Sequence, residues 1–507
     1  MHQKPGYAGK ILRVNLSIGQ VLTVPTEIYA ERFLGGRGVA IKIYWDEAPP
    51  EVNALAPENL LAVTTGPIGG VPGFAGSRWQ ISGKSPLQHG FSYGNLGGAW
   101  GAQLKFAGYD GLVVQGRADK LTCLVIDQDK VELREASHLK GQGAIAVREA
   151  LKKQLGPSFR VLAVGPAGEN LVTFATILAD SDSSGAGGLG AVMGAKNLKA
   201  IAVRGRNKIE VADPSRAAHL KAKLRELNFK AFPPPTHILP RERLKKDVCF
   251  GCIDGCIRRT YTSRDGLTGK YMCQSRFFYE TRARRYYGQP SEVSFLATKL
   301  CDDHGLDATV VETMIMWLSR CHKAGLLNET ETGLPLSKLG SLEFIETLVH
   351  TISHREGFGD LLAEGTLKAA QSLGRGSEDY ITDYMTKTGE SAIYGSRIYL
   401  TTGLLYALEP RQPIQQLHEI SAPALLWAAR QTGLEDNFMT SQVIRQIAHR
   451  FWGGEIAADF STYEGKAMAA ARIQDRQYAK ECLILCDLSW PVLFSPQTPD
   501  HVGDPSL

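Results

Sequence analysis

The chain has 507 residues, of which 43% are hydrophobic and 21% charged, and its formal net charge is +5. This composition is typical of a globular protein with a large core and excludes disordered, collagen-like and coiled-coil proteins. No apolar run approaches the roughly eighteen residues that span a bilayer, and the N-terminus lacks a signal-peptide pattern. We therefore expect a cytoplasmic protein without a membrane span.

Residues 1–205 contain 31 of the 53 glycines. Short β-type runs alternate with glycine and proline turns in this part, and only AIAVREALKKQL shows helical periodicity. The β-type runs are ILRVNL, LLAVTTGPIGG, WQISG, DGLVVQG, LTCLVID, VLAVGPAG and LKAIAVRG. This pattern predicts a β-rich domain over residues 1–207.

After residue 207 the spacing of apolar residues becomes helical. AAHLKAKLREL precedes a proline-rich segment at 232–240, which we expect to be a linker. Helical spacing then recurs in SEVSFLATKLCDDHG, ATVVETMIMWLSRCHKAG, LEFIETLVHTISHREG, FGDLLAEGTLKAAQSLG and residues 422–433. The sequence thus predicts an α+β protein with helical domains over residues 208–390 and 391–507.

Cys249, Cys252 and Cys256 have the spacing C-x2-C-x3-C. Thiolates at this spacing can turn towards one metal centre and supply three of the four ligands of a cuboidal iron–sulfur cluster. A zinc site is one alternative, although it would usually bring a second C-x2-C or a histidine pair, and uncoordinated thiols are another. Spacing leaves the fourth ligand open among the remaining cysteines, which are Cys123, Cys273, Cys301, Cys321, Cys482 and Cys486.

The segment 241–285 contains twelve basic and five acidic residues, so positive charge is concentrated around these cysteines. Such a surface is either simply solvated or attracts an acidic partner. The chain has no nucleic-acid-binding motif, and we expect no nucleic-acid partner.

Two glycine-rich stretches, GNLGGAWG at 94–101 and SDSSGAGGLGAVMG at 181–194, have consecutive backbone amides of the kind that bind phosphates. Neither matches a Walker loop, and tight turns in a sheet explain them equally well. Arg78 enters an apolar strand, which fits a surface position or a binding site. Asp302 and Asp307 in CDDHGLD fit a helix end followed by a cap as well as a ligand-binding motif.

Together these stretches resemble the aldehyde:ferredoxin oxidoreductase family, whose members hold a tungsten or molybdenum bis-pterin beside a 4Fe-4S cluster. The first 205 residues carry the resemblance in LGGRG, AVTTGPIGG, SGKSPL, LGGAWGAQLKFAGYDGLVVQG, VGPAGENLV and GLGAVMGAKNLKAIAVRG. It resumes at the cysteine segment, CDDHGLD, REGFGDLLAEG and ECLILCDLSWPVLFSP. The resemblance implies that the β-rich domain holds the bis-pterin.

The resemblance also implies a role for individual residues. Cys249, Cys252, Cys256 and the distant Cys486 match the four cluster ligands, and Arg78 matches an arginine between pterin and cluster. The residues that match loops holding the pterin phosphates and a bridging magnesium ion are Asn95, Gly97, Ser183 and Gly185. The residues that match two pterin-holding DxxGLD-type motifs are Asp302, Leu306 and Asp307, and Glu481 and Leu485. His418 would move the proton, with Glu409 as the alternative.

Several positions depart from the family pattern. Asp182 and Ala186 stand where arginines are common, so the pterin phosphates must be neutralised by other residues. Leu296 and Lys299 replace an ExxH pair that binds an iron between subunits, so a homodimer would form without that iron. Gln415 occupies the position nearest to the active-site histidine, and CQSRFFYE lacks an expected glutamate. The chain is also short in the middle and ends at VGDPSL, where relatives continue, which is what we expect of a fragment or a truncated product.

The resemblance implies oxidation of a small-molecule aldehyde to its carboxylate, or another two-electron reaction at an oxo group. Electrons would pass through the cluster to an acidic ferredoxin-like carrier or an iron–sulfur partner subunit, which suits the basic segment. The alternatives are a reductive subunit similar to benzoyl-CoA reductase and an electron-transfer subunit that has lost the pterin.

Overall fold

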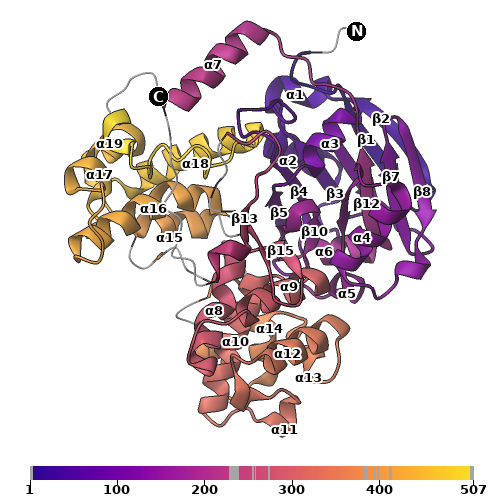
Figure 1. The fold of residues 1–507 in the computed structure, drawn as a ribbon, viewed down its shortest axis with the longest axis vertical. Helices are drawn as coiled ribbons and strands as arrows, with labels where there is room; N and C mark the ends of the chain where they lie inside the picture. The colour runs from indigo at the N-terminus through magenta and orange to yellow at the C-terminus, as the bar shows by residue number, and fades with distance from the viewer. Residues whose placement is uncertain are drawn as a thin grey trace.

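The structure is a computed structural model that describes residues 4–227, 239–253, 256, 258–271, 274–381, 385–386, 389–391, 395–396, 399–409, 411 and 414–502. A β-rich base, coloured indigo to violet in Figure 1, carries two helical lobes, one magenta to orange and one orange to yellow. Most of the expected linker at 232–240 lies outside the described residues, as does Cys273.

The base contains two six-stranded sheets. The strands of the first are β1 (Lys10–Asn15), β2 (Gln20–Pro25), β3 (Leu61–Thr65), β4 (Trp79–Lys84), β5 (Phe91–Leu96) and β6 (Gly111–Gln115). The strands of the second are β7 (Thr122–Asp127), β8 (Lys130–Glu135), β9 (Arg160–Ala163), β10 (Ile177–Ala179), β11 (Ser183–Gly185) and β12 (Leu198–Arg204). Their orders are β2-β1-β6-β3-β4-β5 and β11-β10-β9-β12-β7-β8. Strand pairs are antiparallel except β1 with β6 and β7 with β12.

The two sheets share one core. Side chains alternate along each strand, so Leu12 and Val14 of β1 meet Leu124 and Ile126 of β7 in the same buried cluster. The helices of the base are α1 (Glu27–Phe33), α2 (Gly36–Glu47), α3 (Trp100–Phe106), α4 (Ala144–Leu155), α5 (Pro166–Glu169) and α6 (Leu189–Ala195). Periodicity predicts only α4, because a helix such as α6, with every residue buried, has no polar face to produce a helical pattern.

A small antiparallel sheet carries the cysteine segment. It consists of β13 (Leu244–Lys246), β14 (Arg259–Thr262) and β15 (Thr268–Lys270), and the C-x2-C-x3-C motif lies between β13 and β14. The exposed helix α7 (Pro214–Glu226) precedes it and has no buried residue.

The core of the first helical lobe continues into α5 and α6 of the base, whereas the second lobe has a core of its own. The first lobe contains α8 (Gln274–Tyr287), α9 (Val293–His304), α10 (Ala308–Lys323), α11 (Glu329–Thr332), α12 (Leu342–His354), α13 (Phe358–Leu362) and α14 (Thr366–Leu373). The second contains α15 (Leu400–Leu408), α16 (Ile414–Gln431), α17 (Ser441–Ile447), α18 (Lys466–Leu483) and α19 (Thr498–His501). The predicted α+β class is confirmed, while the exact domain boundaries stay a prediction. Among the described residues, no helix is both long and apolar enough to cross a bilayer.

The end of α18 packs directly on glycines of the base. A Cβ atom at Gly36 would overlap the carbonyl oxygen of Glu481, and one at Gly66 would overlap that of Leu483. These glycines belong to the LGGRG and GPIGG stretches. They allow the backbone after α18 to approach the base more closely than any side chain would permit.

Candidate functional site

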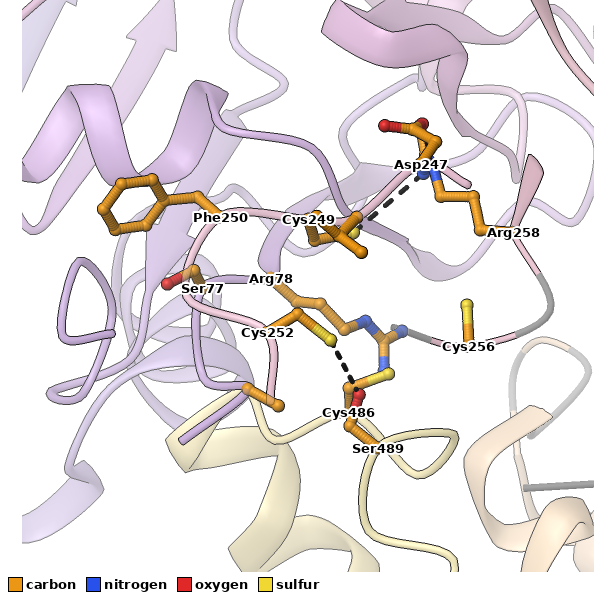
Figure 2. Close-up of a pocket in the computed structure, with 12 residues that line it drawn as sticks. Ser77, Arg78, Asp247, Cys249, Phe250, Cys252, Cys256, Arg258, Cys486 and Ser489 are labelled. Carbon is orange, nitrogen blue, oxygen red and sulfur yellow. Dashed lines mark hydrogen bonds and ion pairs between the residues drawn. The ribbon is translucent and has the colours of Figure 1, made fainter. Parts of the chain in front are cut away.

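Four thiols from distant parts of the chain line one pocket (Figure 2). Cys249, Cys252 and Cys256 come from the loop after β13, and Cys486 comes from the segment that follows α18. Arg78, which directly precedes β4, extends its guanidinium between these thiols towards Cys486. In the part of the chain that the structure describes, no three His, Cys, Asp or Glu side chains are close enough to hold a single metal ion.

The donor set of this pocket fits an iron–sulfur cluster. The Gly98 N–H donates to Cys249 Sγ at 3.2 Å, and Ser489 Oγ lies 3.2 Å from Cys252 Sγ. Hydrogen bonds of this kind stabilise thiolates and tune cluster potentials. Burial raises the pKa of the Cys486 thiol, whereas the Arg78 guanidinium opposes that rise. A bound metal centre would supply the further positive charge that keeps a buried thiolate deprotonated.

The sequence motif did not reveal Arg258, which is also part of this pocket. Its side chain is buried, its Nε donates to the Asp247 carboxylate, and its Nη1 lies 4.0 Å from Cys249 Sγ. The only sequence signal was its position two residues after Cys256 in the basic segment.

The glycine-rich stretches meet where the two sheets approach each other. A Cβ atom at Gly94 of β5 would lie 3.0 Å from the Cα of Gly185 in β11. Asn95, the next residue of β5, accepts a hydrogen bond from Gln80 Nε2 at 2.9 Å. Close packing of β5 on β11 therefore accounts for Gly94 and Gly185, and the phosphate-binding role of Asn95, Gly97, Ser183 and Gly185 stays a prediction.

Asp182 and Lys299, two departures from the family pattern, form an ion pair with each other. Lys299 Nζ lies 2.8 Å from Asp182 Oδ2 and 2.5 Å from Asp302 Oδ2, and all three side chains are buried. Arg148 Nη2 pairs with the other Asp182 oxygen at 2.5 Å. Burial alone would raise the pKa of Asp182, but Lys299 and Arg148 hold it well below its usual range.

The two other residues of the first DxxGLD-type motif have structural contacts. Asp307 caps α10, because its carboxylate accepts from the Thr309 N–H at 3.0 Å. Leu306 is buried and forms a β-bridge with Ala175. These contacts position the end of α9 against the base.

A buried polar cluster lies where α18 meets the base. Arg37 of α2 pairs with Glu481, with 2.5 Å between Nε and Oε2, and its guanidinium stacks 3.6 Å from the ring centroid of Tyr93. Burial raises the pKa of Glu481 to about 7, with Arg37 opposing and Glu409 reinforcing the shift. Among the described residues, the side-chain polar atoms of Arg37, Tyr93 and Glu481 have no hydrogen-bond partner of good geometry.

Unsatisfied buried polar atoms are rare in native proteins and require an explanation, such as a bound polar ligand. A pterin carries many hydrogen-bonding groups, so the Arg37–Tyr93–Glu481 cluster fits the group that the resemblance implies. Arg37 lies in the LGGRG stretch, which was the signal that could have identified it.

The two predicted proton-transfer residues occupy different surroundings. Glu409 is 2% exposed and accepts hydrogen bonds from Tyr478, from Gln416 at 2.9 Å and from Gln474 at 3.1 Å. The side chain of His418 is 26% exposed, and its Nδ1 lies 3.8 Å from Asp487 Oδ2.

Asp487 directly follows Cys486 and also pairs with Lys480. Burial would raise the pKa of Asp487, but Lys480 and His418 hold it well below its usual range. The structure thus connects His418, through an ionised carboxylate, to the segment that carries the fourth thiol.

Comparison with known proteins identifies the class and the family. Two family models match, aldehyde ferredoxin oxidoreductase, N-terminal domain, over residues 11–205, and aldehyde ferredoxin oxidoreductase, domains 2 & 3, over residues 217–504. The tungsten-containing aldehyde ferredoxin oxidoreductase of Pyrococcus abyssi is 32% identical over 452 residues, which are 80% of this chain and 73% of that protein. The chain is therefore an oxidoreductase. It belongs to the aldehyde ferredoxin oxidoreductase family.

Two further relatives show the breadth of this similarity. The aliphatic sulfonate oxidoreductase, WOR-like subunit, of Pyrococcus furiosus is 28% identical over 427 residues, covering 72% of this chain and 67% of that protein. The solved active site complex BamBC of benzoyl coenzyme A reductase, in complex with 1,5 dienoyl-CoA, superposes with a TM-score of 0.76. It is 26% identical, and the match covers 96% of this chain and 82% of that one.

Proposed function

We propose that the protein is a tungsten- or molybdenum-dependent oxidoreductase that oxidises an aldehyde to its carboxylate. The observation that carries this proposal is the pocket of four thiols and Arg78, to which Asp487 connects His418. The name of the Pyrococcus abyssi relative supports tungsten and a ferredoxin acceptor. Oxidation of an aldehyde and water to a carboxylate releases two electrons and three protons. The site must therefore conduct both electrons and protons away from the substrate.

Cys249, Cys252, Cys256 and Cys486 would hold the 4Fe-4S cluster. Arg37, Tyr93 and Glu481 would hold the bis-pterin, together with Asn95 and Gly97 at its phosphates and a magnesium ion. When bound, this group supplies a Lewis acid and a two-electron acceptor. Arg78 contacts the cluster pocket from the side of the base and would connect the two sites.

His418 would carry protons between the site and the solvent. Its partial exposure and its position 3.8 Å from an ionised Asp487 suit an imidazole that passes protons between the site and the solvent. Glu409 accepts three hydrogen bonds, which suits a residue that holds its neighbours in place.

A cavity of about 210 Å³ beside Asp487 would accept the substrate. Phe451, Trp490 and Phe494 form an apolar wall, while Arg476 and Lys480 pair with Glu419 and Asp487 of the same lining. We therefore propose an aldehyde with an apolar body as substrate.

The electron acceptor would be an acidic ferredoxin-like protein or an iron–sulfur subunit. Lys245, Lys246 and Arg264 are exposed on the small sheet that carries the cysteine loop, so an acidic carrier would dock close to the cluster. A homodimer would lack a bridging iron, because Lys299 is already bound to Asp182 and Asp302.

Metal analysis of anaerobically purified protein tests the proposal. We expect about four irons and one tungsten or molybdenum per chain, and reduction of ferredoxin when an aldehyde is added. Iron without tungsten or molybdenum would instead identify an electron-transfer subunit. One zinc without iron would contradict the cluster assignment.

A reductive role is a second candidate, which the likeness to the BamBC complex favours. The same preparation distinguishes the two roles. A reductive subunit would oxidise dithionite-reduced ferredoxin in the presence of an aromatic thioester and would leave aldehydes unchanged.

A further inference from the structure

Arg258 lies between the two predicted cofactor sites. It is 5% exposed and lies directly before β14, two residues after Cys256. Its Nη1 lies 4.0 Å from Cys249 Sγ and donates to Ser183 Oγ at 3.3 Å. Its Nη2 donates to the Ser181 carbonyl. One guanidinium therefore contacts a cluster thiol and both ends of the turn at 181–183.

Gly97 shows how close these groups are to each other. A Cβ atom at this position would lie 2.6 Å from Cys249 Sγ and 3.6 Å from both Arg258 Nη1 and Ser183 Oγ. The absent side chain thus leaves Cys249, Arg258 and Ser183 facing one another. Any larger residue at position 97 would separate them.

The carboxylates around the turn do not compete for the Nη edge of Arg258, which contacts Ser181, Ser183 and Cys249. Asp182, in the same turn, is already neutralised by Lys299 and Arg148. Asp247 pairs with the Nε edge of Arg258 and holds the guanidinium in its orientation. A guanidinium stays protonated in proteins, so Arg258 is a cation at this position.

We infer that Arg258 is a positioning residue that links the two cofactor sites, holding the turn at 181–183 and stabilising the reduced form of the cluster through Cys249. The inference rests on the proposed function for the identity of both groups. A cation near a thiolate ligand favours the form of the cluster with the additional electron, and therefore raises its midpoint potential. The same cation would supply positive charge beside the predicted phosphate turn, where the family's arginine is replaced by Asp182.

The test uses Arg258→Gln and Arg258→Lys in the full-length holoenzyme, with Arg204→Gln as the matched control. Arg204 is also paired with an aspartate, Asp127, but lies at the end of β12 and does not line the cysteine pocket. The readouts are the cluster midpoint potential from an EPR-monitored redox titration, and tungsten or molybdenum retained after gel filtration.

We expect Arg258→Gln to lower the midpoint potential of the cluster by at least about 59 mV. This corresponds to a tenfold decrease in the equilibrium constant for one-electron reduction. We also expect it to lose most of its tungsten or molybdenum, whereas Arg204→Gln changes neither readout. Arg258→Lys keeps the charge but not the forked contacts to the turn, so its potential should stay near the wild-type value while metal retention falls.

Unchanged potential and metal content in Arg258→Gln would overturn the inference. Should that variant fail to assemble its cluster, Arg258→Lys decides, because wild-type metal retention in it would contradict the role at the turn. Wild-type protein with iron but without tungsten or molybdenum would refute the proposed function alone, since the potential measurement needs only the cluster.

Discussion

Lys299 is the only cation placed between Asp182 and Asp302 among the described ion pairs of those two residues. Lys299→Met would leave Asp302 buried without this partner, and Asp182 with its ion pair to Arg148 and a hydrogen bond from the Lys270 N–H. Removing one member of a buried ion pair costs about 3–5 kcal/mol, and we expect a loss of that size in the free energy of unfolding. Chemical denaturation measures it.

Lys338→Met is the matched control, because Lys338 pairs with Glu343 on the surface. Exposed pairs contribute little to stability because water screens them, so this variant should be nearly neutral. Equal losses in the two variants would show that the Asp182–Lys299–Asp302 network adds no stability beyond that of a surface pair.

Cys486→Ala tests the fourth ligand. With three thiolates left, we expect loss of the visible absorption of the 4Fe-4S cluster and of its reduced-state EPR signal. Cys482→Ala is the control, since that thiol lies one helical turn earlier against Gly38 and does not line the pocket. An intact cluster in Cys486→Ala would refute the assignment.

The residue types at the site were only partly predictable. The spacing of Cys249, Cys252 and Cys256 indicated a metal centre because three thiols lie within eight residues. Cys486 and Glu481 came from family resemblance, because no local pattern indicates a contact between segments hundreds of residues apart. Arg258 and Tyr93 were missed, since a buried arginine and a strand tyrosine are identified only by their partners.

The contact between helices α2 and α18 depends on the absence of a side chain at Gly36. Gly36→Ala would place a Cβ against the Glu481 carbonyl at a residue whose φ is +46°. We expect a loss of about 3 kcal/mol or more in the free energy of unfolding, through backbone displacement at the domain contact. Thermal and urea unfolding would both report it.

Gly19→Ala is the control that separates the steric clash at position 36 from the free-energy cost of a positive φ in a residue other than glycine. Gly19 also has a positive φ, +62°, but no atom lies within 4 Å of the added Cβ. This variant should lose only the roughly 1–2 kcal/mol of a left-handed non-glycine residue. The same loss at both positions would contradict steric interlocking of α2 and α18.

The contact between α9 and α12 predicts a pH dependence. Burial, with a smaller effect of neighbouring His354 and His350, lowers the pKa of His304 to about 4, and Asp303 opposes this shift. Between about pH 6.5 and 4 the unfolded chain binds a proton at this residue and the folded chain does not, so stability falls as pH falls through that window. The loss is at most about 3 kcal/mol.

His304→Gln should reduce the slope of the free energy of unfolding against pH, measured by urea unfolding from pH 7.5 to 4.5. The exposed His138 provides the control, and His138→Gln should keep the wild-type slope. Parallel slopes for wild type and His304→Gln would rule out His304 as the titrating group.

The prediction of helices from the sequence was most accurate for helices that have one polar and one apolar face. α4, α10 and α12 each bury one side, so their sequences carry a helical period. The predicted helix at 358–374 is divided into α13 and α14 at Gly365, whose φ is +91°. Strands β10 and β11 were missed because each has only three residues.

For the whole molecule, the basic surface around the cysteine loop predicts how a carrier binds. The double variant Lys245→Glu/Lys246→Glu should raise the KM for an acidic ferredoxin about tenfold and weaken its salt dependence, with kcat for a small viologen acceptor unchanged. Lys120→Glu/Lys130→Glu makes the same charge change at exposed lysines beside β7 and β8 and should leave the KM unaltered. Equal effects of the two pairs would indicate a general charge effect.

The overall architecture was predictable because glycine-rich β-type runs and helical spacing occupy separate halves of the chain. The contacts between the halves were not, because Gly36 and Gly66 look like ordinary turn glycines in sequence. Their function in packing becomes visible only when the carbonyls of Glu481 and Leu483 lie against them.

The pocket also has an order of assembly in time. Cys486 follows Cys256 by 230 residues, and translation adds about 5–20 residues per second, so roughly 10–50 s separate the third thiol from the fourth on the ribosome. Throughout that interval the nascent chain has the three cysteines of the loop after β13 but lacks Cys486. Insertion of the proposed cluster would therefore follow synthesis, and the three early thiols would need a reducing environment until then.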